Sequence, residues 1–117
     1  MVSGEWWVTR FSDMARKPKT GPASDPEILI LSSLASGAKH GYAIMTDVET
    51  FAGVRLGPGT LYTAIARLVE KKLIAPQSGA GRQRPYRLTA QGARYLKELL
   101  NNMQQVAGVG LTRLRTA

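Results

Sequence analysis

Two prolines stand where helices are expected to begin, and a turn with two glycines precedes the second of them. Asp25 can cap a helix whose first residue is Pro26, and Glu27 places a carboxylate in its first turn. Pro58 opens another helix in the same way, directly after the turn at 52–57. This pattern predicts three short helices whose second and third members are joined by a tight turn, which is a helix-turn-helix.

Each expected helix carries one apolar face, and together these faces define a small core. We expect the first helix to end at Gly37, the second to run over about 41–51, and the third to end near Lys72. At about 100° per residue, the apolar residues of each segment gather on one side. The expected buried residues are Ile28, Leu29, Leu31, Leu34 and Ala35 in the first helix, Ile44, Met45 and Val48 in the second, and Leu61, Ala64, Ile65 and Leu68 in the third.

Two short extended segments follow the third helix. Residues 73–75 are apolar, 78–81 form a turn of small residues, and 84–88 alternate apolar and polar side chains. Pro76 and Pro85 suit an exposed edge rather than a central strand. The pair of segments predicts a β-hairpin, which would be the wing of a winged helix-turn-helix.

A long apolar stripe marks the last helix, which we expect to begin near Thr89. We expect the first three helices to fill the core, so that this stripe is left to bind a second chain. Gly108 and Gly110 weaken the helix, and we expect residues 111–117 to fray or fold back. The predicted dimer-interface residues are Ala93, Leu96, Leu99, Leu100, Met103, Val106 and Ala107.

The expected fold class is therefore mainly α with a small β-hairpin, a winged helix-turn-helix plus a C-terminal dimerisation helix. We divide the chain into an N-terminal helical extension and linker at 1–24, the DNA-binding domain at 25–89 and the dimerisation helix at 90–117. These boundaries follow the Pro- and Ser-containing linker and the cap at Thr89.

The N-terminal extension contains both tryptophans of the chain. Trp7 and Phe11 share one face of a short expected helix, and Trp6 precedes them. This helix either packs on its own domain or a partner subunit, or its aromatic side chains line a pocket for a planar effector.

The positive charge is concentrated in one part of the chain. Sixteen Lys and Arg residues against eight Asp and Glu residues give a formal net charge of +8. Nine of these cations and one of the acids fall between Gly53 and Lys97, so this window accounts for the whole surplus. Such a cluster predicts an anionic partner, and the phosphate backbone of DNA fits it best.

The composition also excludes several kinds of site. The chain has no cysteine and a single histidine, His40, which excludes thiolate chemistry and a histidine-based zinc site. We expect no metal, no cofactor and no enzyme activity, because neither a nucleophile–base pair nor paired acids are visible. No apolar run reaches 18 residues and the start lacks the apolar core of a signal peptide. We therefore expect a cytoplasmic protein without a membrane span.

The polar face of the third helix predicts a surface that enters the major groove. Arg67 can form two hydrogen bonds with a guanine, and Thr63 and Ala66 allow close approach to a thymine methyl group. Thr60 and the amides after Gly59 lie at the helix start, where a phosphate can bind.

Three further residues complete the predicted DNA-binding set. Tyr62 either donates a hydrogen bond to a phosphate or packs against the second helix. Arg82 and Arg84 flank the tip of the wing and are expected to contact phosphate or the adjacent minor groove.

Four short elements occur in a fixed order between 26 and 100. They are His40-Gly41-Tyr42, Pro58-Gly59-Thr60-Leu61-Tyr62, Arg67-Leu68 followed by Leu73-Ile74, and Tyr86-Arg87-Leu88-Thr89 followed by Gly92. Together these elements resemble the PadR-type transcriptional regulators.

The resemblance implies a winged-helix repressor that dimerises through its C-terminal helix. The single short C-terminal helix is similar to that of the smaller subfamily, in which some members bind flat aromatic or cationic compounds between the subunits and then release DNA. Thr63 stands where the family often has proline, and the wing at 77–83 is short. Because the C-terminal helix lacks the tryptophan that small members use as a ligand platform, we carry over no effector site.

We therefore expect a sequence-specific DNA-binding regulator, a ligand-responsive repressor that acts as a homodimer on an inverted-repeat operator. Its expected partners are double-stranded DNA, a second copy of the chain and a small aromatic or hydrophobic effector. The alternative is a nonspecific architectural nucleic-acid-binding protein. The ratio of the affinities for the native upstream region and for random DNA separates the two.

Overall fold

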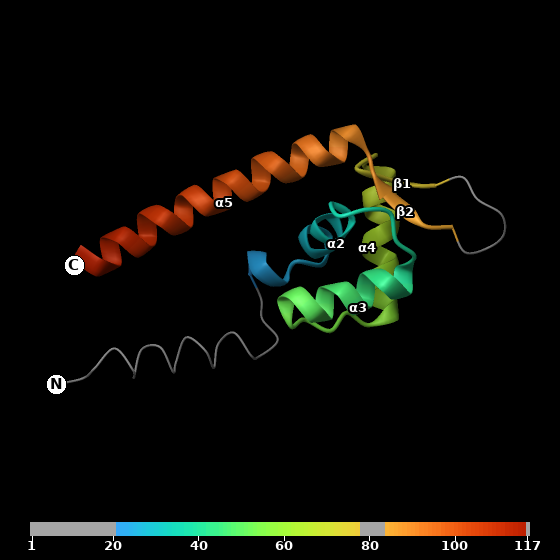
Figure 1. Ribbon diagram of the computed structural model, residues 1–117, viewed down its shortest axis with the longest axis horizontal. Helices are drawn as coiled ribbons and strands as arrows, with labels where there is room; N and C mark the ends of the chain where they lie inside the picture. The colour runs from blue at the N-terminus through green and yellow to red at the C-terminus, as the bar shows by residue number, and fades with distance from the viewer. Residues whose placement is uncertain (1–20, 78–83, 117) are drawn as a thin grey trace.

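Three short helices, a hairpin and one long helix follow one another along the chain (Figure 1). The computed structural model describes residues 21–77 and 84–116, so the predicted sites at Trp6, Trp7, Phe11 and Arg82 lie outside the described residues. The fold class is confirmed as mainly α with a two-stranded hairpin and a C-terminal helix. The elements are η1 (Pro22–Ser24), α2 (Pro26–Leu34), α3 (Gly41–Ala52), α4 (Pro58–Glu70), β1 (Ile74–Pro76), β2 (Tyr86–Leu88) and α5 (Ala90–Thr116).

Helix α2 begins as predicted and ends earlier than predicted. Asp25 Oδ1 accepts a hydrogen bond of 2.9 Å from the backbone amide of Glu27, and Pro26 is the first helical residue. The helix ends at Leu34 rather than at Gly37. The amide of Gly37 donates to the carbonyl three residues back, so the chain tightens into a turn before the glycine is reached.

Helices α3 and α4 form the helix-turn-helix. Gly53 caps the end of α3 with a φ of 68°, a backbone conformation that glycine adopts at little cost. Gly57 precedes Pro58 at the start of α4, as predicted. Helix α4 ends at Glu70, and Lys72 has a φ of 65° and turns the chain into β1.

Helix α2 lies at the centre of the core. The four predicted core residues of α4 are all buried, as are Ile44 and Val48 of α3. In α2, Ile30 is also fully buried although it lies outside the predicted stripe, and Ala35 is exposed. The reason is that α2 packs against α3 and α4 and also meets α5 and β2, so most of its circumference is covered.

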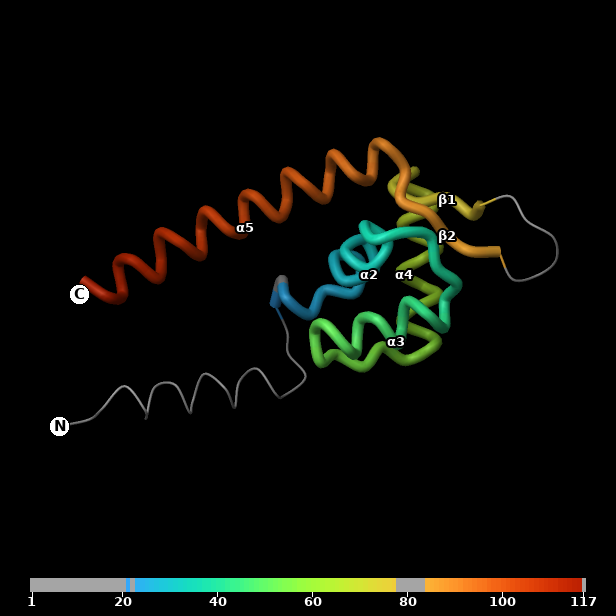
Figure 2. The backbone as a smooth tube through the Cα atoms, viewed as in Figure 1, coloured from blue at the N-terminus to red at the C-terminus, as the bar shows by residue number. Residues whose placement is uncertain are grey.

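The wing is joined to the turn before α3. Strands β1 and β2 pair in antiparallel register, with Ile74 opposite Leu88. Lys39 extends this sheet, because its amide and carbonyl exchange hydrogen bonds of 3.0 and 2.9 Å with the backbone of Tyr86. The backbone trace shows this connection beside the hairpin (Figure 2). The wing is therefore fixed to the start of the helix-turn-helix as well as to its end.

A polar network ties α2 to α3. The buried hydroxyl of Ser33 donates a hydrogen bond of 2.7 Å to Asp47 Oδ2. Lys39 Nζ donates to the carbonyl oxygen of Ser33 and to Ser36 Oγ, at 2.5 and 2.7 Å, and lies 3.9 Å from Asp47. The ammonium group thereby satisfies polar groups at the end of α2, where helix carbonyls have no helical partner.

The start of α5 is fixed to the end of α4. Thr89 caps α5, because its Oγ1 accepts a hydrogen bond of 2.9 Å from the amide of Gly92. Its hydroxyl lies within donating distance of the carbonyls of Lys72 and Leu73, at 2.8 and 3.0 Å, and its amide donates to Leu73 O. A methyl group at Gly92 would overlap that same carbonyl oxygen. The glycine thus allows the closest approach of α5 to the turn before β1.

Helix α5 continues without a break to Thr116, so the prediction that residues 111–117 fray or fold back is wrong for 111–116. Neither Gly108 nor Gly110 has a positive φ. Each glycine costs a helix only about 1 kcal/mol, which is not enough to end it when no capping structure follows. Arg113 and Arg115 in the last turn also suit the negative end of the helix dipole.

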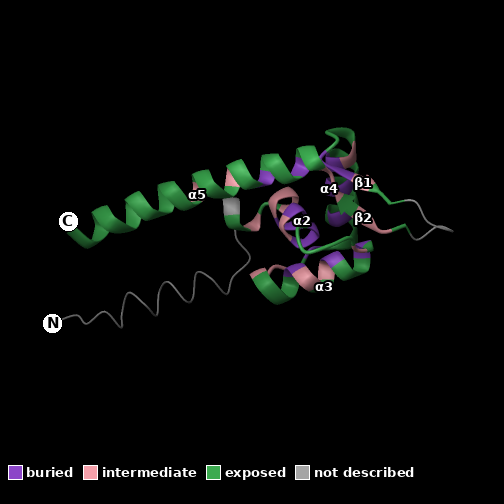
Figure 3. Ribbon diagram, turned by 45° about the horizontal axis from the view of Figure 1, so that its top comes forward, coloured by how far each residue is buried: buried purple, intermediate pink, exposed green. Residues whose placement is uncertain are grey.

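Of the helix α5, the first turns are the part that packs on the other described residues (Figure 3). Leu96 is buried in the core, which corrects the prediction that the first three helices fill it. Beyond Met103, the residues of α5 through Thr116 are exposed. Across residues 21–77 and 84–116, no helix is both long and apolar enough to cross a membrane.

Candidate nucleic-acid interface

Helix α4 separates its residues into a buried and an exposed face. Leu61 and Leu68 have no exposed surface. The opposite and flanking positions are exposed, as expected for a helix that offers side chains to a partner. These exposed residues are Gly59, Thr60, Tyr62, Thr63, Ala66 and Arg67, which together make the predicted α4 part of the DNA-binding set.

Tyr62 lies over the start of α3 and is half exposed. A methyl group at Gly41 would overlap the phenol of Tyr62, so the glycine gives the ring room to approach α3. The tyrosine nevertheless exposes 52% of its surface. Of the two alternatives predicted for Tyr62, packing against the second of the three short helices, α3, is therefore observed. Its exposed part is still able to approach a phosphate.

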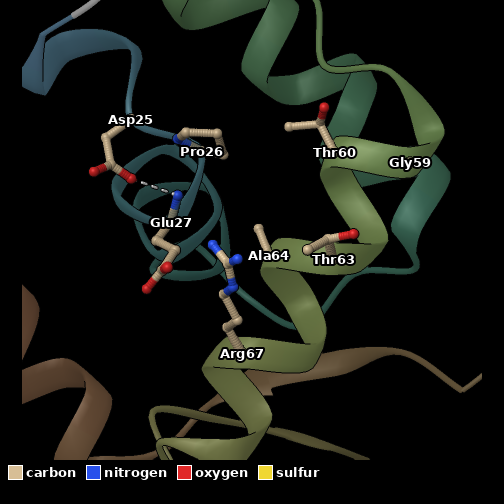
Figure 4. A pocket seen from close by; sticks show the side chains of 8 residues that line it. All are labelled: Asp25, Pro26, Glu27, Gly59, Thr60, Thr63, Ala64 and Arg67. Atoms are coloured by element: carbon tan, nitrogen blue, oxygen red, sulfur yellow. Dashed lines mark hydrogen bonds between the residues drawn. The ribbon is translucent and has the colours of Figure 1, made fainter.

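A cleft of about 440 Å³ separates the exposed side of α4 from the start of α2 (Figure 4). Arg67 extends its guanidinium group into this cleft toward α2, while Thr60 and Thr63 lie nearer the start of α4. Asp25 and Glu27 form the opposite wall. The cleft therefore joins hydroxyl, guanidinium and carboxylate groups in one surface.

The two walls are joined by an ion pair between Glu27 and Lys71. Lys71 Nζ donates a hydrogen bond of 2.8 Å to Glu27 Oε1. This hydrogen bond, and next the negative charge of Glu27, raise the pKa of Lys71, whereas the nearby charge of Arg67 acts in the opposite direction. Within the described residues, Arg67 has no carboxylate within 4.0 Å.

The basic residues of the wing and of the start of α5 are also exposed. Arg84, Arg87, Arg94 and Lys97 are all exposed, and in the described part of the chain none of them has a carboxylate partner within 4.0 Å. The other predicted wing residue, Arg82, lies outside the described residues. These four cations of the described part of the wing and of α5 thus remain free to attract an anion.

Sequence reasoning missed the acidic wall of the cleft. The sequence indicates Asp25 and Glu27 only as helix-start residues, whereas the structure places them opposite Arg67 across the cleft. The contact that places Glu27 beside α4 is its ion pair with Lys71. These two residues are 44 positions apart, so no local pattern in the sequence joins them. The bridge between Lys39 and Tyr86 was missed for the same reason.

A second surface runs along α5. Of the predicted interface residues, Leu96 is buried in this chain's own core, and Leu99 and Met103 are partly buried. The others, Ala93, Leu100, Val106 and Ala107, are exposed.

The unbroken helix extends this apolar face beyond its predicted end. Val106 exposes 64% of its surface and Leu114 72%, large values for apolar side chains. An apolar hollow of about 470 Å³ lies between α5 and Ala23, lined in α5 by Asn102, Met103, Val106 and Ala107.

The family model described as the transcriptional regulator PadR-like family matches residues 30–98, which is more than half of the chain. The chain belongs to this family. The matched PadR-like region begins inside α2, includes the helix-turn-helix and the wing, and ends in the buried part of α5. The chain thus has the winged-helix DNA-binding fold of PadR-like transcriptional regulators.

Solved structures agree with this assignment. A PadR family transcription regulator from hypervirulent Clostridium difficile is 31% identical, with a TM-score of 0.66 over 76% of this chain and 97% of that chain. A transcriptional regulator from Clostridium thermocellum is 30% identical, with a TM-score of 0.63 over 71% and 86% of the two chains. A PadR family transcriptional regulator from Eggerthella lenta, 24% identical, shares the fold with a TM-score of 0.63 over 91% and 90%.

A curated relative is larger than this chain. An uncharacterized 37.1 kDa protein in transposon TN4556 of Streptomyces fradiae is 45% identical over 85 residues. The match covers 73% of this chain and 25% of that protein, so the chain spans about a quarter of the length of this relative.

Proposed function

We propose that this protein is a sequence-specific repressor that binds an inverted-repeat operator as a homodimer. The observation that carries the proposal is the exposed polar face of α4, beside which Arg84 and Arg87 have no carboxylate partner among the described residues. In a winged helix-turn-helix the second helix of the motif enters the major groove and the wing contacts the backbone beside it. Here Arg67 would read a base, and Thr60, Tyr62 and Arg84 would contact phosphates.

The exposed part of α5 supports the homodimer. Val106 and Leu114 lie on the part of α5 past Met103, where all residues through Thr116 are exposed, and a soluble chain seldom leaves such a stripe in water. Two copies that pack through α5 would each present one α4 helix. The two half-sites would then be centred about one helical turn apart, roughly 34–36 Å.

The hollow beside Ala23 supports a response to a small molecule. Its lining by Met103, Val106 and Ala107 suits an aromatic or hydrophobic effector, and it lies on the α5 face that the second copy would share. An effector bound there would change how the two copies meet and would release the operator.

Selection of binding sites from a random pool of duplexes tests the proposal. Repeated capture on the full-length protein should enrich an inverted repeat, and the enriched duplex should bind at least a thousandfold more tightly than shuffled DNA at physiological salt. A pool that stays random, or a ratio near one, would contradict the proposal and favour the nonspecific architectural protein.

A further inference from the structure

Among the described residues, the acids beside the cations of the proposed DNA-binding surface are Asp25, Glu27 and Glu70, and Glu27 is the one that forms an ion pair there. Glu27, in the first turn of α2, is bound to Lys71 at the end of α4 through the 2.8 Å hydrogen bond. The side chain of Glu27 is 25% exposed and that of Lys71 is 53% exposed, so the pair lies at the surface. A carboxylate at such a place repels phosphate, and its presence calls for a physical role.

Asp25 and Arg67, which line the same cleft as Glu27, make different contacts. Asp25 accepts a hydrogen bond from the backbone amide of Glu27 and thereby caps α2. The side chain of Glu27 is the one that holds a cation. Arg67 lies in the last turn of α4 and Lys71, four residues later, caps the helix end in a helical conformation, so the two lie on the same side. Glu27 holds Lys71, whereas Arg67 extends into the cleft without a carboxylate partner within 4.0 Å among the described residues (Figure 4).

We propose that Glu27 is a specificity-determining residue that keeps Lys71 away from DNA phosphates while Arg67 stays free to read the operator. Affinity for arbitrary DNA depends on how many phosphates the protein neutralises, because each contact releases condensed counterions. Because Lys71 is held by Glu27, it does not neutralise a phosphate. Base contacts made by Arg67 are unaffected, so the difference in affinity between operator and other DNA is kept large. This inference rests on the proposed function.

Loss of the Glu27 carboxylate should change how strongly the affinity for DNA depends on salt. If Glu27→Gln releases Lys71 to one additional phosphate, the slope of log K against log salt concentration becomes steeper by about 0.9. At 0.15 M salt this corresponds to about fivefold tighter binding of shuffled DNA. The operator complex gains less, because the contacts of α4 in the groove already set its position, so the ratio of operator to shuffled affinity falls.

The experiment measures fluorescence anisotropy of labelled duplexes with the full-length protein between 0.05 and 0.3 M KCl. The probes are the duplex recovered by selection on the wild type and a shuffled duplex of the same length. The variants are E27Q, the double variant E27Q/K71Q, and E98Q. Glu98 is an exposed residue of α5 without an ion-pair partner in the described part of the chain, so E98Q makes the same change in net charge.

The expected result is a roughly fivefold gain for shuffled DNA in E27Q, no gain in E27Q/K71Q, and a change below about twofold in E98Q. Circular dichroism melts of all three variants should agree with the wild type to within a few degrees, because exposed ion pairs contribute little to stability. The inference is overturned if E27Q binds shuffled DNA no more tightly than E98Q does. It is also overturned if the gain persists in E27Q/K71Q, since Lys71 would then not be the released cation. A wild-type protein that binds both probes alike contradicts the proposed function itself, whatever the variants do.

Discussion

The contact between Gly92 and the carbonyl of Leu73 predicts opposite effects for one substitution at two places in α5. In Gly92→Ala the new methyl group would overlap Leu73 O and lie 2.8 Å from the carbonyl carbon. The overlap involves backbone, which cannot rotate away as a side chain can. Helix α5 must therefore move from the turn before β1, and two hydrogen bonds of Thr89 lengthen: the one from its amide to Leu73 O and the one that its hydroxyl donates to Lys72 O or Leu73 O.

The loss of stability in Gly92→Ala can be worked out from these contacts. Overpacking of a tight site costs about 1–3 kcal/mol, and each weakened hydrogen bond adds about 0.5–1.5 kcal/mol. The better helix propensity of alanine returns about 0.5–1 kcal/mol. We expect Gly92→Ala to lower the free energy of unfolding by about 3 kcal/mol, which for a domain of this size lowers Tm by about 12–24 °C.

Gly108→Ala is the matched control in the same helix. Among the described residues, no atom outside the helix's own backbone lies within 4 Å of a methyl group added at Gly108, so the helix propensity is what changes. We expect this variant to gain about 0.5–1 kcal/mol and to melt a few degrees above the wild type.

Thermal unfolding followed by circular dichroism at 222 nm measures both variants. Samples are kept at one protein concentration, because association makes Tm depend on concentration. The reasoning about close packing is refuted if Gly92→Ala melts within about 4 °C of the wild type, or if Gly108→Ala is the less stable of the two.

Three further predictions concern other parts of the molecule. Asp47→Ala should lower stability by about 1–2 kcal/mol in urea unfolding, because the buried hydroxyl of Ser33 loses its acceptor; Asp47→Asn, which keeps an oxygen, should lose less. Arg67→Ala should relax base preference at one position of the selected operator, whereas Arg84→Ala should weaken binding to all sequences and reduce the salt slope by about one; similar profiles for the two variants in a competition assay would count against these roles. Val106→Asp should yield a folded monomer by light scattering, since Val106 is 64% exposed in a single chain; an unchanged mass would exclude this face of α5 from the interface.

Local signals predicted the helix-turn-helix well. The start of α4 follows directly from the proline at its first position, and the four apolar residues on its inner face are all buried. The cap of α2 was likewise predicted from Asp25, Pro26 and Glu27, and the structure contains its hydrogen bond. These features depend on residues within one or two turns of each other, so a pattern in the sequence is sufficient to find them.

The errors have a common physical origin. The prediction for the end of α5 was wrong because a glycine only lowers helix propensity. A helix ends where a capping conformation replaces its hydrogen bonds. The burial of Ile30 and Leu96 depends on which elements surround α2, and no single segment contains that information. The Glu27–Lys71 pair joins residues far apart in the chain, so only the folded structure brings it into the candidate site.

The hydrogen bonds of Thr89 and the close contact at Gly92 fix the start of α5 to the turn that follows α4. Helix α5 is about 40 Å long, from 27 residues at 1.5 Å each. If its far half is held by a second copy, as proposed, the separation of the two α4 helices depends on the crossing angle of the two α5 helices. The middle of the held half is about 30 Å from the start of α5, so a rotation of about 7° there moves α4 by about 3.5 Å, which is close to one base-pair step of DNA. A small angular change at the dimer contact would therefore be enough to move α4 out of register with its half-site.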